Sequence, residues 1–139
     1  MAEATRSGAA ALAVRPGEER WTETELGEVR AELESEVAER RTEISKAESE
    51  IAERIGDAVA DAGDDLADAG AKTFEREQEL AATHHAKELL EQNERALARI
   101  TAGTYGVCES CGKPIGKARL QAFPRATLCV ACKQREERR

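Results

Sequence analysis

Residues 103–133 read GTYGVCESCGKPIGKARLQAFPRATLCVACK and contain all four cysteines of the 139-residue chain. The cysteines form two couples, Cys108 with Cys111 and Cys129 with Cys132, and two residues separate the members of each couple. This spacing lets both sulfurs of a couple face one point, so the two couples can supply four thiolates in a tetrahedron. We therefore predict one structural Zn²⁺ with four protein ligands and no coordination position open for catalysis.

Spacing alone leaves three other uses of the cysteines open: two disulfides, a pair of redox-active dithiols, or one disulfide with two thiols. A disulfide framework is typical of short secreted chains, but residues 1–14 lack the basic leader and apolar core of an export signal. A thioredoxin-like dithiol needs a strand and helix context that this sequence does not indicate. We therefore expect a soluble, cytoplasmic zinc protein, in which Gly112 takes the positive φ that a metal knuckle often needs.

Upstream of the cysteines, the sequence predicts a long helix that begins at about Thr22. Thr22 and Glu25 have the spacing of a capping box, and Trp21 and Leu26 stand at the two positions of a hydrophobic staple. Apolar residues then recur mostly at steps of three and four, a narrow stripe close to a coiled-coil seam. The stripe consists of Leu26, Val29, Leu33, Val37, Ile44, Ala47, Ile51, Ile55, Ala58 and Val59.

A second helix is predicted from about Ala71 to Thr101, with Gly103 as the residue that ends it. Between the two helices, residues 61–70 are rich in Asp, Ala and Gly, and we expect a bend there with Asp68 as a helix cap. Because a thin apolar stripe is unstable alone in water, the second helix should fold back on the first.

The predicted fold class is therefore mainly α, a long antiparallel two-helix coiled-coil hairpin with a small C-terminal four-cysteine zinc finger. Residues 1–20 are small, polar and unpatterned, and we expect a flexible N-terminal tail there. Residues 21–103 should form the coiled-coil arm, with an acidic tip at about 61–70. Residues 104–139 should form the finger module with a short C-terminal helix.

Formal charge is unevenly distributed along the chain. Residues 1–70 hold 19 acids and 8 bases, a net of −11, whereas residues 71–139 hold 9 acids and 13 bases, a net of +4. An acidic front half is a poor match for a phosphate backbone. The sequence has no Ser-His-Asp arrangement or phosphate-binding glycine loop, and we expect no enzyme activity. The acids at the bend are either a solvated turn or a group that meets a hydrated Mg²⁺ or basic side chains.

The order of long helix, acidic bend, second helix and finger, with the segments GTYGVCESCGKPIGKARL and LCVACK, resembles the bacterial DksA/TraR family. The resemblance is most specific over residues 103–133. It implies a transcription regulator that binds RNA polymerase and places its coiled-coil tip in the secondary channel, toward the active-site Mg²⁺, without binding DNA itself. The family's tip motif Asp-x-x-Asp-x-Ala implies that Asp65 and Asp68 act on the partner, with Asp64 and Gly70 beside them.

The chain also departs from the family pattern. Gly70 stands where the tip motif has Ala, which weakens the start of the second helix. Members that respond to guanosine tetraphosphate use basic residues at positions that are Gln92 and Phe123 here, whereas Lys133 keeps its charge. We therefore expect weak or no cooperation with that nucleotide, with Lys133 as a possible contact. An alternative function is a structural adaptor whose coiled coil and zinc finger bind another protein. A nucleic-acid-binding finger, based on the basic C-terminus, ranks last because the chain has few aromatic residues and an acidic arm.

Overall fold

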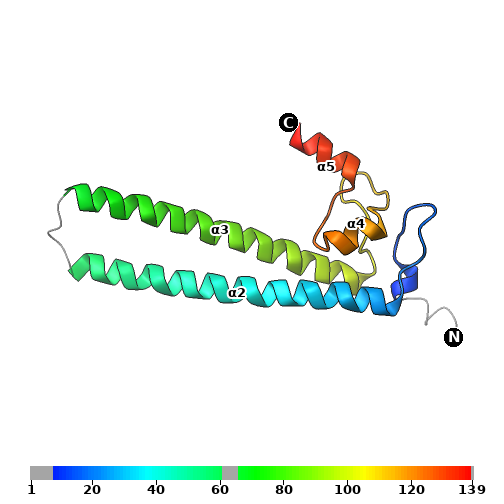
Figure 1. Cartoon of the computed structure of the whole chain (residues 1–139), viewed down its shortest axis with the longest axis horizontal. Helices are drawn as coiled ribbons and strands as arrows, with labels where there is room; N and C mark the ends of the chain where they lie inside the picture. The colour runs from blue at the N-terminus through cyan, green and yellow to red at the C-terminus, as the bar shows by residue number, and fades with distance from the viewer. Residues whose placement is uncertain (1–7, 61–65, 139) are drawn as a thin grey trace. The chain divides into compact units, whose positions relative to one another are not determined.

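In the computed structural model of the chain, residues 8–60 and 66–138 are described, with side chains for all of these except 57–60 and 66–72. The elements in chain order are η1 (Ala9–Ala11), α2 (Glu23–Ala60), α3 (Leu66–Ala102), α4 (Lys117–Ala122) and α5 (Val130–Glu137) (Figure 1). The described residues form no strand and hold one isolated antiparallel bridge, between Val107 and Pro114. The predicted fold class, mainly α with two long helices packed together and a C-terminal cysteine cluster, is confirmed. In this described part, none of the helices combines the length and apolar character needed to cross a bilayer.

α2 begins at the capping box that the sequence predicted. The Thr22 N–H donates to the Glu25 carboxylate at 3.0 Å, and the Glu25 N–H donates to the Thr22 hydroxyl at 3.1 Å. Trp21 and Leu26 are both buried in one core cluster, as a hydrophobic staple requires. Local side chains therefore satisfy backbone donors that the first turn of a helix leaves without partners.

α3 begins earlier than predicted and ends where predicted. It starts at Leu66 rather than near Ala71, so Asp68 lies within its first turn and the expectation that Asp68 caps the helix was wrong. Alanines in this stretch have the highest helix propensity and extend the helix in spite of Gly70. At the other end Gly103 takes a φ of 79°, the left-handed conformation that closes many helices.

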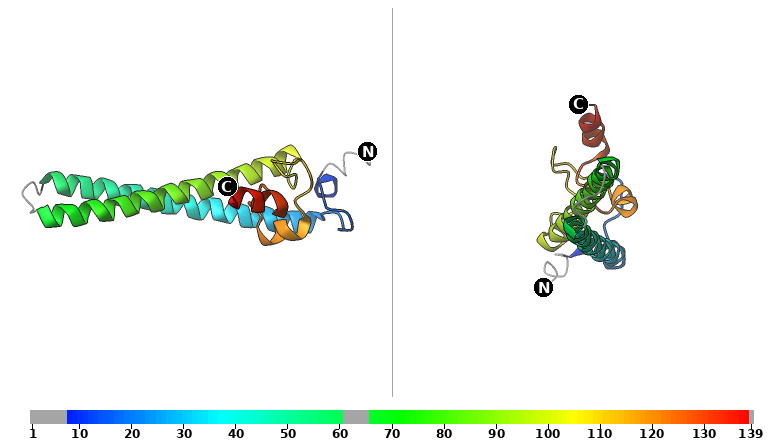
Figure 2. Two further views of the ribbon diagram at one scale, coloured as in Figure 1. Left: turned by 90° about the horizontal axis from the view of Figure 1, so that it is seen from above. Right: turned by 90° about the vertical axis from the view of Figure 1, so that its left-hand side faces the viewer.

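The chain divides into two compact units. The base comprises residues 8–37 and 92–138 of the described chain, and the arm comprises residues 38–91. Within the arm, α2 and α3 run side by side in opposite directions (Figure 2). Ion pairs join the two helices there, between Arg54 and Glu79 and between Lys87 and Glu48 at 3.2 Å.

The arm has little buried core. Among its described side chains only Thr83 and Ala86 are buried, whereas Ile55 and Leu80 are each 51% exposed. Two helices alone cannot enclose a broad apolar surface, which fits the narrow stripe read from the sequence.

The base has one apolar core to which every part of the base contributes. At its centre the rings of Trp21 and Tyr105 lie 6.0 Å apart between centroids, with 55° between their planes. The Tyr105 hydroxyl donates to the Pro124 carbonyl at 2.8 Å. Burial, with a smaller contribution from the negative charge of Glu32, raises the pKa of Tyr105. The buried cluster consists of Ala9, Leu12, Trp21, Leu26, Val29, Leu33, Ala96, Ile100, Tyr105, Cys108, Ile115, Leu120 and Cys132.

Residues 8–20, here called the strap, are packed onto this core rather than forming part of a flexible tail. Ala9 and Leu12 are buried, and the Ala9 N–H donates to the Glu23 carboxylate at 3.1 Å. The strap passes so close to Gly106, which has a φ of 95°, that a Cβ there would lie 3.2 Å from the Ala13 carbonyl oxygen. The expectation for 1–20 was therefore wrong from Gly8 onward, because isolated apolar residues without a period still fill the core.

Glu18 joins the strap to α4. Its carboxylate accepts hydrogen bonds from the backbone N–H groups of Lys117 at 3.0 Å, Ala118 at 3.1 Å and Arg15 at 2.8 Å. Burial opposes ionisation of Glu18, but these backbone donors outweigh it and lower the pKa of the carboxyl. The carboxylate thus serves as a cap for α4 that comes from the other end of the chain.

Lys117 is a buried cation at the same junction. Its ammonium lies 2.6 Å from the Glu25 carboxylate and 5.9 Å from the centroid of the Trp21 ring, and it donates to the Arg20 carbonyl. The hydrogen bond from Lys117, followed by the backbone bond from Thr22, lowers the pKa of Glu25 to about 2. The capping box of α2 is therefore also a contact point for α4.

Candidate metal centre

The four cysteine sulfurs converge in the base. Their Sγ atoms all lie within 4.8 Å of one another, and the Sγ atoms of Cys111 and Cys129 are 3.8 Å apart. A Zn²⁺ bound by four thiolates at about 2.3 Å sets its sulfurs about 3.8 Å apart in a regular tetrahedron. The donor set and its spacing therefore fit a four-coordinate zinc ion.

The first pair of cysteines lies in a tight backbone turn. The Cys108 N–H donates to the Lys113 carbonyl at 2.8 Å, and the Gly112 N–H donates to the Cys108 carbonyl at 3.0 Å. Gly112 has a φ of 76°, as predicted, a conformation that an L side chain would strain. The turn brings the Cys111 sulfur back toward that of Cys108.

The second pair lies at the start of α5. Cys129 is the N-cap residue and Cys132 lies in the first turn, so both side chains approach the same end of the helix. The Cys129 N–H donates to the Cys108 Sγ at 3.4 Å, which links the two pairs. The partial positive charge at a helix N-terminus favours the thiolate form of Cys129, the N-cap residue.

The backbone prepares some of these thiols to ionise. Burial opposes ionisation of Cys108, but backbone N–H groups of Cys111, Cys129 and Ser110 outweigh it and lower the pKa to about 6. The Cys132 N–H lowers the pKa of Cys129, whereas the neighbouring Cys129 sulfur raises the pKa of Cys132 to about 11. Four thiolates repel one another, so a bound divalent cation is what ionises the complete set.

Arg135 is a part of the centre that sequence reasoning did not single out. Its guanidinium lies 3.6 Å from the Cys132 Sγ, where it offsets negative charge on the thiolates. The sequence could have indicated this contact, because Arg135 follows Cys132 by three residues and residues three apart share one face of a helix.

Two arginines and one glutamate attach the finger to α3. The Glu109 carboxylate lies 3.4 Å from the guanidinium groups of both Arg95 and Arg99. Arg99 also donates to the carbonyls of Thr104, at 3.0 Å, and of Val107. Since Glu109 lies between the first two cysteines, these contacts join the metal-binding turn to the end of α3.

The side chains of the predicted tip residues lie outside the part of the chain that the structure describes. Asp64 and Asp65 lie outside the described residues, and for Asp68 and Gly70 only the helical backbone of α3 is described. Their role stays a prediction. Lys133 is exposed on α5, and Phe123 is 58% exposed just after α4.

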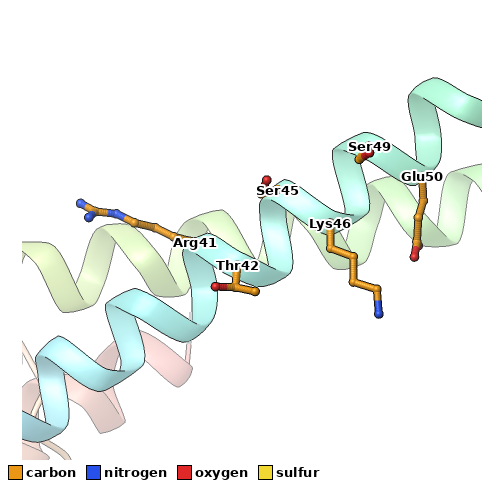
Figure 3. Close-up of a pocket in the computed structure, with 6 residues that line it drawn as sticks. All are labelled: Arg41, Thr42, Ser45, Lys46, Ser49 and Glu50. Carbon is orange, nitrogen blue, oxygen red and sulfur yellow. The ribbon is translucent and has the colours of Figure 1, made fainter.

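Elsewhere on the arm, one shallow hollow is formed by side chains of α2 alone (Figure 3). Arg41 and Lys46 extend from it in different directions, so its polar groups do not converge. In the described ranges, the four cysteines are the only gathering of three or more potential metal ligands among His, Cys, Asp and Glu. The hollow is lined by Arg41, Thr42, Ser45, Lys46, Ser49 and Glu50.

Four converging thiolates beside the ends of two long antiparallel helices define a helical protein with a C4-type zinc finger. The family described as "Prokaryotic dksA/traR C4-type zinc finger" matches residues 103–138. The structure of transcription factor DksA2 from Pseudomonas aeruginosa is similar with a TM-score of 0.66 and 30% sequence identity, over 84% of this chain and 85% of that chain. The chain therefore belongs to the DksA/TraR family, and its four-cysteine finger holds one structural Zn²⁺.

Two curated relatives are similar to part of the chain. The RNA polymerase-binding transcription factor DksA of Caulobacter vibrioides is 43% identical over 65 residues, 47% of this chain and 46% of that protein. The protein of the same name from Escherichia coli is 40% identical over 55 residues, 40% of this chain and 36% of that protein. The chain thus spans less than half the length of these two relatives.

Proposed function

We propose that this chain is a transcription regulator that binds bacterial RNA polymerase and inserts its acidic coiled-coil tip into the secondary channel to modulate initiation. The observation that carries the proposal is the likeness to DksA2, a transcription factor, over 85% of that chain at 30% identity. Two curated relatives, each similar over less than half of this chain, are named RNA polymerase-binding transcription factors. The similarity to DksA2 covers 84% of this chain, so it extends well beyond the finger into the long helices.

In this proposal Asp65 and Asp68 act on the polymerase, with Asp64 and Gly70 shaping the tip around them. Carboxylates are suited to Mg²⁺-bound water and to basic side chains, the groups expected near a site of nucleotide transfer. The motif Asp65 to Gly70 matches the family tip except for its last residue. The chain then needs no chemistry of its own, and we propose that it is not an enzyme.

The zinc finger has a structural role in this mechanism. Its metal has four protein ligands, which leave no position for substrate or activated water. Glu109 ties the first metal-binding turn to Arg95 and Arg99 on α3. We propose that the finger holds the ends of both helices together and offers a surface to the polymerase, in the cytoplasm and without direct recognition of DNA.

Guanosine tetraphosphate is proposed to cooperate weakly or not at all. Of the three family positions compared, Gln92 and Phe123 lack a positive charge and Lys133 retains one. A phosphate-rich ligand loses charge-assisted hydrogen bonds at each neutral position. Lys133 is exposed and is the one candidate contact among these three.

The test is the double substitution Asp65→Asn with Asp68→Asn. It should leave binding to RNA polymerase within about threefold of wild type, because the base is untouched, and should abolish the effect on transcription from a responsive promoter. A matched control, Glu50→Gln with Glu53→Gln, removes the same charge at the same spacing from the arm outside residues 61–70 and should keep activity. Wild-type regulation by the tip variant would refute the mechanism.

The alternative is a structural adaptor that binds another protein through its coiled coil and finger. The half-exposed apolar side chains Ile55 and Leu80 on the arm favour some protein contact there. An adaptor would not co-purify with RNA polymerase, and neither double variant would change transcription.

A further inference from the structure

The finger carries an uninterrupted basic stretch. Residues 112–135 contain six basic side chains and no acidic one. Two of these charges are used within the base, since Lys117 pairs with Glu25 and Arg135 faces Cys132. The six are Lys113, Lys117, Arg119, Arg125, Lys133 and Arg135. A surface of one charge sign is complementary to an acidic partner and disfavours a basic one.

An exposed aromatic ring lies within this basic stretch. Phe123 is 58% exposed, and the guanidinium carbon of Arg119 lies 5.8 Å from its ring centroid. Phe123 is the one aromatic residue of the described finger that faces solvent, because Tyr105 is buried. Large apolar side chains next to arginine are typical of the residues that contribute most to protein interfaces.

The backbone under this ring is held in place. The Phe123 N–H donates to the Arg119 carbonyl at 2.7 Å, and the Ala126 N–H donates to the Phe123 carbonyl at 3.0 Å. Directly after it, the Pro124 carbonyl accepts the buried bond from the Tyr105 hydroxyl. A side chain on such a fixed turn loses little backbone freedom when it is buried by a partner.

Arg119 ties the same turn to the second metal-binding segment. Its Nε donates to the Leu128 carbonyl at 3.3 Å, while its guanidinium stays over the Phe123 ring. Two residues after Leu128, Val130 is 47% exposed and adds a second apolar side chain to the finger. Ring, arginine and turn are thus organised before any partner binds.

We infer that Phe123 and Arg119, with the exposed Arg125 two residues further along the chain, form a docking ledge for an acidic protein segment, with the Phe123 ring as its apolar anchor. The inference rests on the proposed function for the identity of the partner, which is RNA polymerase. A protein fits better than a nucleic acid, because Arg119 already engages the ring and a carbonyl. The arm would also repel the phosphate backbone of a nucleic acid, since residues 38–91 hold more acids than bases.

The experiment measures the affinity of the zinc-loaded full chain for purified core RNA polymerase. Phe123→Ala should weaken binding by about tenfold or more, the effect of removing an interface anchor. Phe123→Tyr keeps the ring and should bind within about twofold of wild type. Lys113→Ala removes one charge from the same basic stretch without touching the ring and should weaken binding by about twofold to threefold. Zinc content and thermal unfolding of each variant show that the finger is intact.

The outcomes separate the docking ledge from the proposed function. If wild type and a folded Phe123→Ala variant bind polymerase equally well, the docking ledge is wrong and the proposed function is unaffected. Wild type that fails to bind polymerase overturns both. Equal losses for Phe123→Ala and Lys113→Ala, or binding of wild type to DNA alone with a steep salt dependence, would identify a diffuse basic surface instead of an apolar anchor.

Discussion

Leu12→Ala tests whether the strap is part of the folded base. Leu12 is 5% exposed and lies in one cluster with Trp21 and Tyr105. Leu→Ala changes in well-packed cores cost about 2.7–5 kcal/mol, the lower values where the site can collapse. Because Leu12 keeps slight exposure, we expect a loss toward the lower end, about 2–3 kcal/mol in the free energy of unfolding. A residue in a mobile tail would change it by less than about 0.5 kcal/mol.

Urea unfolding with saturating zinc is the assay, because bound metal otherwise varies with the variant. Trp21 is the only tryptophan in the chain and is 2% exposed, so its fluorescence reports on the base. Leu80→Ala is the matched control, since the same atoms are removed from a side chain that is 51% exposed on the arm. For Leu80→Ala, unfolding followed by far-UV circular dichroism should show a loss of about 1 kcal/mol in the free energy of unfolding. A Leu12→Ala value within about 0.5 kcal/mol of wild type, read by Trp21, would refute the packed strap.

Three other perturbations have defined outcomes. Tyr105→Phe removes one buried hydrogen bond and should cost about 1–2 kcal/mol in the same urea assay, so an unchanged midpoint would contradict that bond's contribution. The folded-state pKa of Glu25 lies below its unfolded value, so its stabilisation is present above about pH 4.5 and is lost as pH falls toward about 2. The melting temperature should therefore drop between about pH 4.5 and 2, and by less for Glu25→Gln. Equal drops would show that other carboxyls dominate. Arg135→Ala should release zinc to a chelator about tenfold faster, whereas Arg138→Ala, an exposed arginine on the same chain end, should match wild type.

The features that the sequence predicted well are those set by neighbours in the chain. The capping box of Thr22 and Glu25 needs only four residues, and its two hydrogen bonds formed as expected. Gly103 and Gly112 took positive φ because the chain must reverse at both places. The paired cysteines are equally local within each couple, and their convergence followed from the chemistry of one metal ion.

The features that sequence reasoning missed depend on residues far apart in the chain. Leu12 belongs to no periodic pattern, and its burial is decided by partners such as Tyr105 in the finger. In the sequence alone, Glu18 resembles any other surface acid, because its partners, the backbone N–H groups at the start of α4, lie about 100 residues away. The start of α3 was misplaced because a stretch rich in Asp and Gly indicates a turn, whereas its alanines extended the helix to Leu66.

The strap also imposes an order on how the protein is made. The carboxylate of Glu18 binds backbone groups 99 and 100 residues later in the chain. At about 5–20 residues per second, a ribosome needs about 5–20 s to add that length. Throughout this interval Leu12 and Trp21 leave the exit tunnel without the finger that covers them. The helices can form during synthesis, but closure of the base must wait until the last quarter of the chain has emerged.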